Sequence, residues 1–169
     1  ELDYQKFSID SSGNVSLESS PNYEVDGSGL QFTVRANDGT FNTDKTVTLG
    51  INDVNEVPVI TSGGGRTNVI IDWDENINRF FPVYNVSASD EDFGDTLTYS
   101  LYGPDSGYFN QTARSITFRT SPDYETKSSY LFGAAVSDGL ATRAQSIRIN
   151  IRDVNEAPSI TSSSTASAI

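Results

Sequence analysis

The stretch Asp53-Val54-Asn55-Glu56-Val57-Pro58 recurs with one change as Asp153-Val154-Asn155-Glu156-Ala157-Pro158, at an offset of 100 residues. Three further stretches recur in the same order at nearly the same offset. They are Ser20–Glu24 with Ser121–Glu125, Asp38-Gly39 with Asp138-Gly139, and the alternating Val47, Leu49 and Ile51 with Ile147, Ile149 and Ile151. Chance can supply one such match, but not four in one order. The chain therefore contains parts of at least two copies of a unit of about 100 residues.

The register of the repeat predicts how the chain is divided. Residues 57–156 form one complete copy, residues 1–56 match only the second half of that copy, and residues 157–169 match only its beginning. We expect the first copy to leave its core half covered. It is then marginal alone, or is completed by strands from upstream chain or from a neighbouring molecule.

Charge and composition exclude several classes of function. The chain has 11 basic and 23 acidic residues, a net charge of −12, and no His, Cys or Met. Nucleic acids and anionic membranes are poor partners for so acidic a chain. Without His and Cys there is no thiol nucleophile, no disulfide and no soft-metal site. Carboxylate chemistry and the binding of hard cations remain.

Hydrophobic residues alternate with polar ones along short runs, which is typical of strands with one buried face. Such runs cover residues 30–36, 47–51, 97–101, 116–118, 130–136 and 147–151, and turn-forming clusters such as Asp26-Gly27-Ser28-Gly29 separate them. About seven short strands in each 100 residues predict an all-β fold built as a β-sandwich. The single Trp73 is expected to be a core or strand-edge residue.

The acidic residues gather at recurring places near predicted strand ends, where loops distant in sequence converge. A group of carboxylates repels itself unless a cation neutralises it, and Ca²⁺ prefers carboxylate, amide and carbonyl oxygens. Two other interpretations compete. Any one such loop is more often simply solvated, and the pairs Asp90/Asp92 and Asp123/Glu125 have the residue types of a glycosidase acid and base. No substrate-platform motif accompanies these pairs, so we expect no enzyme.

In order, Glu75-Asn76, Asp90-x-Asp92, Asp123-x-Glu125, Asp138-Gly139 and Asp153-x-Asn155-Glu156-x-Pro158 resemble the motifs of tandem cadherin repeats. The stretch 92–101 is most similar to the cadherin-like repeats of bacterial surface proteins. The resemblance covers nearly the whole chain. It implies Greek-key sandwiches joined end to end, with Ca²⁺ in each junction making the string of repeats rigid.

The resemblance also implies which residues bind the ions. In the first junction one ion would lie among Asn55, Asp90, Asp92 and Asp138, and a second among Glu24, Asp53, Glu56 and Asp92. In the second junction the ligands would be Glu75, Asp123, Glu125, Asp153, Asn155 and Glu156. Three departures stand out: Glu56 and Glu156 replace an expected Asp, the connector is one residue shorter, and Asn22 replaces a carboxylate.

These observations predict a segment of an extracellular or cell-surface protein that acts as a calcium-rigidified adhesin, filament or spacer, as in a biofilm matrix. Its expected partners are other cadherin-like repeats or copies of itself, with no membrane insertion in this segment. The alternative is a polysaccharide-binding module that uses calcium or exposed aromatic residues. A third hypothesis is homotypic assembly, in which another chain donates a strand to the incomplete first copy.

Overall fold

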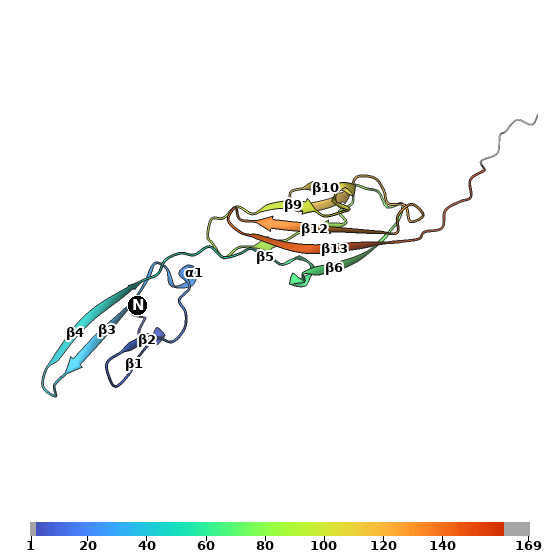
Figure 1. The fold of residues 1–169 in the computed structure, drawn as a ribbon. Helices are drawn as coiled ribbons and strands as arrows, with labels where there is room; N and C mark the ends of the chain where they lie inside the picture. The colour runs from blue at the N-terminus through green and yellow to red at the C-terminus, as the bar shows by residue number, and fades with distance from the viewer. Residues whose placement is uncertain (1–2, 161–169) are drawn as a thin grey trace, which may run out of the picture. The chain divides into compact units, whose positions relative to one another are not determined.

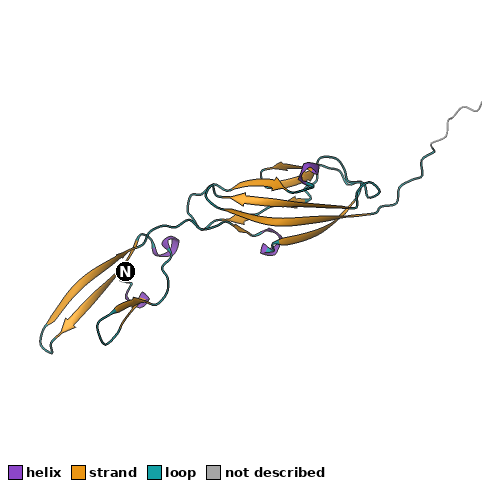
Figure 2. Cartoon of the chain, viewed as in Figure 1, coloured by secondary structure: helices purple, strands orange, loops and turns teal. Residues whose placement is uncertain are grey.

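The computed structural model describes residues 3–160, and most of these residues lie in strands and the turns between them (Figures 1 and 2). The strands are β1 (Phe7–Ile9), β2 (Val15–Leu17), β3 (Gly29–Asn37), β4 (Asn42–Gly50), β5 (Val59–Ile60), β6 (Asn68–Asp74), β7 (Tyr84–Asn85), β8 (Ala88–Ser89), β9 (Thr98–Tyr102), β10 (Phe109–Thr112), β11 (Ser115–Phe118), β12 (Ser129–Ser137) and β13 (Thr142–Arg152). The helical elements are α1 (Tyr23–Asp26) and the 3-10 turns η1 (Tyr4–Lys6), η2 (Ser62–Gly65) and η3 (Ser106–Tyr108). The described residues form two compact units, residues 3–57 with 90–96, and residues 58–89 with 97–160.

The second unit is a β-sandwich, which confirms the predicted all-β fold. One sheet has the strand order β6-β13-β12-β9 and the other β10-β11-β7, and β5 pairs with β8. Between the sheets lie Phe109, Phe118, Phe132, Ile147 and further apolar side chains, with Ile147 fully buried. Trp73 on β6 packs against this core, as expected. The alternating apolar runs of the sequence supply these inward faces.

The parallel pairing of β6 with β13 places the end of one strand beside the end of the other. In this register Trp73 pairs with Ile151 and Asp74 with Arg152. The Arg152 guanidinium lies 2.7 Å from Asp74 Oδ1, and the backbone N–H of Glu75 donates to the carbonyl of Arg152 at 3.2 Å. Glu75, which directly follows β6, therefore lies beside the connector that directly follows β13.

The first unit consists of two hairpins, β1–β2 and β3–β4. In the described part of this unit Leu30 is the only buried hydrophobic side chain. Val47 is 36% exposed, whereas its counterpart Ile147 in the second unit is 0% exposed. A groove of about 320 Å³ opens over Phe7, Phe32 and their neighbours. Among residues 3–57 there is no counterpart of β6, β7 or β9, and the exposure of Val47 shows that the inner face of these hairpins is only partly covered within the described residues.

In each unit, backbone hydrogen bonds at the open end of the long hairpin, β3–β4 or β12–β13, position the acidic turn that precedes it. Gly29 pairs with Gly50 at the open end of β3–β4, and the N–H of Ile51 donates to the carbonyl of Ser28 at 3.0 Å. In the second unit the N–H of Ile151 donates to Ser128 at 2.9 Å. In both units the acidic turn before the hairpin and the connector after it therefore lie at the same end of the hairpin.

Candidate metal centres

In the first unit, a group of three carboxylates comes from three separate segments. Glu24 lies on α1, Asp53 in the connector after β4, and Asp92 in the segment 90–96. One carboxylate oxygen from each lies within 4.8 Å of the others. Three like charges this close repel one another strongly in the absence of a counter-charge. The structure thus brings together three residues that the sequence analysis assigned to one ion, and their binding of an ion stays a prediction.

Glu56 adds a fourth carboxylate to this first cluster. Its backbone N–H donates to Asp92 Oδ2 at 2.9 Å. Loss of hydration raises the pKa of the Glu56 carboxyl, and the negative charges of Glu24 and Asp92 raise it further. Among the described residues, Glu56 Oε2 is buried and has no hydrogen-bond partner. A buried carboxylate oxygen without a donor is costly, and a cation beside it would offset that cost.

Asp90 and Asp138 were assigned together with Asn55 and Asp92 to another ion. Asp90 Oδ1 accepts from the backbone N–H of Asp92 at 3.2 Å, while Asp90 Oδ2 is buried without a hydrogen-bond partner in the described part of the chain. Asp138 belongs to the second unit, in the turn after β12. There its Oδ1 accepts from the backbone N–H groups of the two turn residues 140 and 141 at 2.6 Å each. The grouping of Asp138 with Asp90 stays a prediction.

The asparagine of the connector makes the same bond in both copies. Asn55 Nδ2 donates to the carbonyl of Glu56 at 2.7 Å, and Asn155 Nδ2 donates to the carbonyl of Glu156 at 3.2 Å. This bond fixes the local turn of the connector. An amide nitrogen can only donate, so the oxygen of the same amide is the atom with the chemistry of a cation ligand.

The second unit contains a second carboxylate cluster, formed by Glu75, Asp123 and Glu125 with oxygens within 4.8 Å of one another. Glu75 is only 2% exposed. Its Oε2 accepts from the N–H of Tyr124 and its Oε1 from the N–H of Val154, both at 2.7 Å. These two bonds tie the end of β6 to the acidic turn and to the connector after β13.

The connector residues Asp153 and Glu156 act on this second cluster through their charge. A backbone hydrogen bond lowers the pKa of Glu125, but loss of hydration and the charges of Glu75, Glu156 and Asp153 raise it on balance. Glu156 Oε1 accepts from Asn76 Nδ2 at 2.6 Å. The six residues predicted for this junction are thus brought into one neighbourhood. Five of them interact through their carboxylates, and Asn155 joins them through its bond to Glu156.

Sequence reasoning missed the contacts by which two polar residues, Asn22 and Glu91, contribute to the first cluster. In the first unit Asn22 caps α1, since its Oδ1 accepts from the N–H of Val25 at 2.8 Å, and its Nδ2 donates to Glu91 Oε1 at 2.8 Å. Glu91 also raises the pKa of Glu56. The signal for Glu91 was its position between the two aspartates of Asp90-x-Asp92.

The donor chemistry fits a hard cation. Every clustered ligand is a carboxylate, the neighbouring amides add oxygens, and the chain has no His or Cys. Calcium takes such oxygen ligands, whereas zinc and copper favour nitrogen and sulfur. This chemistry makes both clusters suitable for Ca²⁺, and the buried, unpartnered oxygens of Glu56 and Asp90 add to the case for the first unit.

The comparison with known proteins identifies the kind of repeat. Protocadherin Fat 4 of Homo sapiens is 31% identical over 163 residues, which is 91% of this chain and 3% of that protein. The crystal structure of human mucin-like protocadherin EC1-2 matches with a TM-score of 0.57 and 21% identity, over 87% of this chain and 78% of that one. The chain is cadherin-like.

Two further structures agree with this assignment. Mouse cadherin-23 EC22-24 matches with a TM-score of 0.59 and 24% identity, over 88% of this chain and 50% of that one. The protocadherin gammaB7 EC3-6 cis-dimer matches with a TM-score of 0.62 and 24% identity, over 88% and 39%. No protein-family model matches the chain. The resemblance to cadherin repeats is confirmed, while the particular likeness to bacterial surface proteins stays a prediction.

The chain spans only a small share of the length of Protocadherin Fat 4. None of the helices within residues 3–160 has the length and apolar character needed to cross a bilayer.

Proposed function

We propose that the chain is a calcium-binding, cadherin-like repeat segment of an extracellular or cell-surface protein that serves in adhesion or as a filament or spacer. Calcium would stiffen the connectors that follow β4 and β13. The observation that carries the proposal is the cluster of Glu24, Asp53 and Asp92 with the unpartnered, buried oxygen of Glu56. The second cluster supports it, because it occupies the equivalent connector of the next copy.

The chain's own residues explain how binding would limit motion. Glu24 belongs to α1, Asp53 to the connector, and Asp92 to the segment 90–96, so the three segments must stay together for all three carboxylates to share one cation. Bound Ca²⁺ would supply the positive charge that these carboxylates lack. Since the ordered arrangement would bind the ion better than a loose one, the ion favours the ordered arrangement.

The proposed role is structural and non-catalytic. The clusters hold acidic groups whose charges are balanced only by a cation, and the chain has no His or Cys to serve as base or nucleophile. Other repeats or a second copy of this chain are the proposed partners. A cadherin-like protein among the structural matches, protocadherin gammaB7, is described as a cis-dimer, which supports this choice.

Calcium titration tests the proposal. Isothermal calorimetry is expected to show Ca²⁺ binding to the parent chain, and small-angle scattering a narrower distribution of shapes at saturation. Asp92→Asn should weaken the first site on the order of 100-fold, because affinity depends on the number of charged ligands. Asp44→Asn is the matched control, since Asp44 pairs with Arg35 on exposed β3–β4 and lies outside the clusters.

Two results would contradict the proposal. One is a parent chain that produces no binding heat and no change in scattering at millimolar Ca²⁺. The other is an Asp92→Asn variant that binds as tightly as Asp44→Asn.

A further inference from the structure

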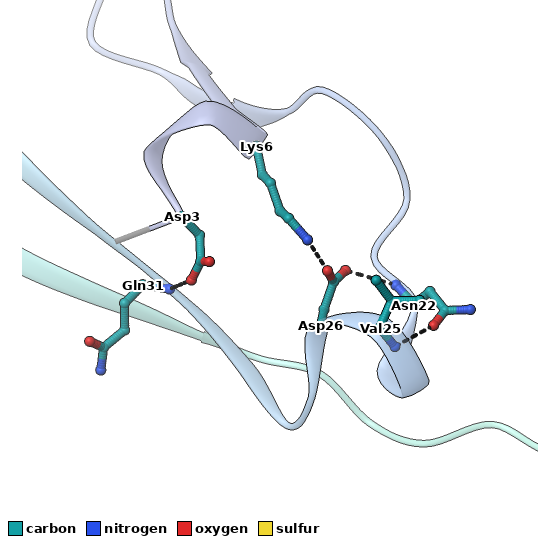
Figure 3. Close-up of polar contacts among 6 residues, drawn as sticks. All are labelled: Asp3, Lys6, Asn22, Val25, Asp26 and Gln31. Carbon is teal, nitrogen blue, oxygen red and sulfur yellow. Dashed lines mark hydrogen bonds and ion pairs between the residues drawn. The ribbon is translucent and has the colours of Figure 1, made fainter. Parts of the chain in front are cut away.

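The short helix that carries Glu24 is held by a polar network (Figure 3). Asp26, the last residue of α1, forms an ion pair with Lys6 at the end of η1, and the Asp26 side chain is only 6% exposed. Its other oxygen accepts from the backbone N–H of Asn22 at 3.0 Å. The cap at Asn22 and the ion pair at Asp26 thus hold both ends of the single turn that presents Glu24.

The equivalent turn of the second unit is held by an ion pair of reversed polarity. Lys127 follows Glu125 by two residues, as Asp26 follows Glu24. Lys127 Nζ lies 2.9 Å from Asp105 Oδ1, and its backbone N–H donates to the carbonyl of Asp123 at 2.9 Å. Here the acid is the residue that precedes η3 and the base lies on the ligand-bearing turn, whereas in the first unit the base is the last residue of η1 and the acid lies on the ligand-bearing turn.

Backbone contacts establish that the two 3-10 turns are equivalent. Asp3 and Asp105 each precede the turn, η1 or η3. The Asp3 carboxylate accepts from the N–H of Gln31 at 2.8 Å, and that of Asp105 from the N–H of Leu131 at 2.7 Å. Gln31 and Leu131 are counterparts at the offset of 100. The last residues of the two turns are Lys6 and Tyr108, so the counterpart of Lys6 is an aromatic ring, 5.3 Å from Lys127 Nζ.

We propose that the two anchoring ion pairs, Lys6–Asp26 and Lys127–Asp105, position Glu24 and Glu125 for cation binding, although none of the four residues is a ligand. The inference rests on the proposed function, because it assigns positioning residues to the same two sites. In both copies an ion pair joins the ligand-bearing turn to the segment of the 3-10 turn, although the positive charge lies on opposite partners. This indicates that the ion pair itself, rather than the sign of either charge, is the common feature.

Elementary energetics explain why such an anchor is needed. A single helical turn is not stable by itself. The clustered carboxylates repel one another before a cation arrives, which pushes the turn that carries Glu24 or Glu125 away from its neighbours. An ion pair at the end of the turn opposes this displacement, so less ordering remains to be done when the ion binds.

Neutralising each lysine tests the inference, because loss of the anchoring ion pair and loss of the positive charge are expected to change calcium affinity in opposite directions. Lys6→Gln and Lys127→Gln each remove a positive charge from a cation-binding protein, so a purely coulombic effect would tighten Ca²⁺ binding. Loss of an anchor should instead weaken the neighbouring site by about tenfold, the low end for residues that support metal ligands. The amide shifts of Glu24 and Asp53 report the first site, and those of Glu125 and Asp153 the second.

Each variant leaves one site as an internal control. Lys6→Gln should weaken only the first site and Lys127→Gln only the second. Without calcium, amide exchange at Val25 and Asp26 should become faster in Lys6→Gln, a readout independent of the metal. Should Lys6→Gln unfold the open first unit, Lys127→Gln poses the same question in the unit with the complete core.

A double variant that gives the first unit the ion pair of the second completes the test. In Lys6→Tyr/Asp26→Lys the new lysine can pair with Asp3 as Lys127 pairs with Asp105, with tyrosine at the counterpart of Tyr108. This double variant should bind calcium at the first site better than Lys6→Gln. If the parent binds calcium and both glutamine variants bind as tightly as the parent or tighter, the anchors are refuted while the proposed function stands. If the parent binds none, the proposed function itself fails.

Discussion

The connectors after β4 and β13 share the four residues Asp-Val-Asn-Glu, and in both the asparagine side chain donates to the carbonyl of the glutamate that follows it. They differ in how the nearby carboxylates are satisfied. Glu75 at the second connector has backbone N–H donors for both of its oxygens, from Tyr124 and Val154. Glu56 at the first has a buried oxygen with no donor in the described chain. The comparison teaches that the fold supplies donors to a central carboxylate of the second cluster, while it leaves a buried carboxylate oxygen of the first cluster without one.

Glu75→Gln should have the largest effect on stability. A glutamine side chain has one acceptor oxygen, so one of the two backbone N–H groups now bonded to Glu75 loses its acceptor, and the second cluster also loses a charge. At saturating Ca²⁺ both effects act in the same direction, and we expect the free energy of unfolding to fall by about 1–3 kcal/mol from the hydrogen bond alone. Trp73, the only tryptophan and part of the same unit, reports unfolding by fluorescence.

Asp72→Asn is the matched control for that measurement, because Asp72 is an exposed carboxylate on the same strand, β6, and undergoes the same change of charge. Equal unfolding curves for the two variants in calcium would show that the backbone donors do not distinguish the second cluster from the first.

Much of this architecture could be predicted from the sequence because it follows from local rules. Period-two alternation located β3, β4, β9, β11, β12 and β13 to within a few residues, since a half-buried strand must alternate. The repeat offset paired Asp53 with Asp153 and Glu24 with Glu125. A helix of one turn such as α1 is too short to show an apolar stripe, so it was not predicted.

The contacts that distinguish the two clusters could not be predicted, since they depend on pairing between distant segments. The bonds of Glu75 require the parallel register of β6 and β13, which no local pattern specifies. The two ion pairs of opposite polarity could not be predicted from the sequence either. Asp26 and Lys127 occupy equivalent positions with opposite charge, and only the placement of η1 and η3 shows that each has a partner.

Acidification should weaken calcium binding at both clusters, because protons compete with calcium for the same carboxylates. Calcium binding at low pH should therefore release protons. The neighbouring carboxylates raise the pKa of Glu56 and, on balance, that of Glu125, so the folded units hold these protons more tightly than the unfolded chain does. Protonation therefore stabilises the calcium-free units at low pH, and this contribution is lost as the pH rises through the raised pKa values. Calcium must displace those protons where they are bound.

Calorimetry in buffers of different ionisation enthalpy measures this release. We expect protons to be released on calcium binding at about pH 5 and almost none at about pH 7.5, where ordinary carboxyl groups are ionised. Glu56→Gln should reduce the number of protons released at about pH 5, because the proton that Glu56 contributes from the first cluster is then absent. Equal proton release at both pH values would mean that the raised pKa values do not belong to the groups that bind calcium.

Asn22→Asp should have the smallest effect. It gives the first cluster the residue type found at the equivalent position of the second cluster, Asp123. The substitution keeps the cap of α1, because aspartate accepts from the Val25 N–H as well as asparagine does. It replaces the donor to Glu91 by a negative charge, so the calcium-free first unit should lose a little stability. The added carboxylate should tighten calcium binding several-fold, since charge count sets affinity.

The reverse substitution, Asp123→Asn, should weaken the second site by a similar factor, and residue-specific amide shifts can follow both titrations. Weaker binding in Asn22→Asp would show that the bond from Asn22 to Glu91 contributes more to the first site than an additional charge does. In that case the two clusters are different solutions to one problem: the second gathers charge around backbone donors, and the first holds a smaller set of carboxylates in place with an amide.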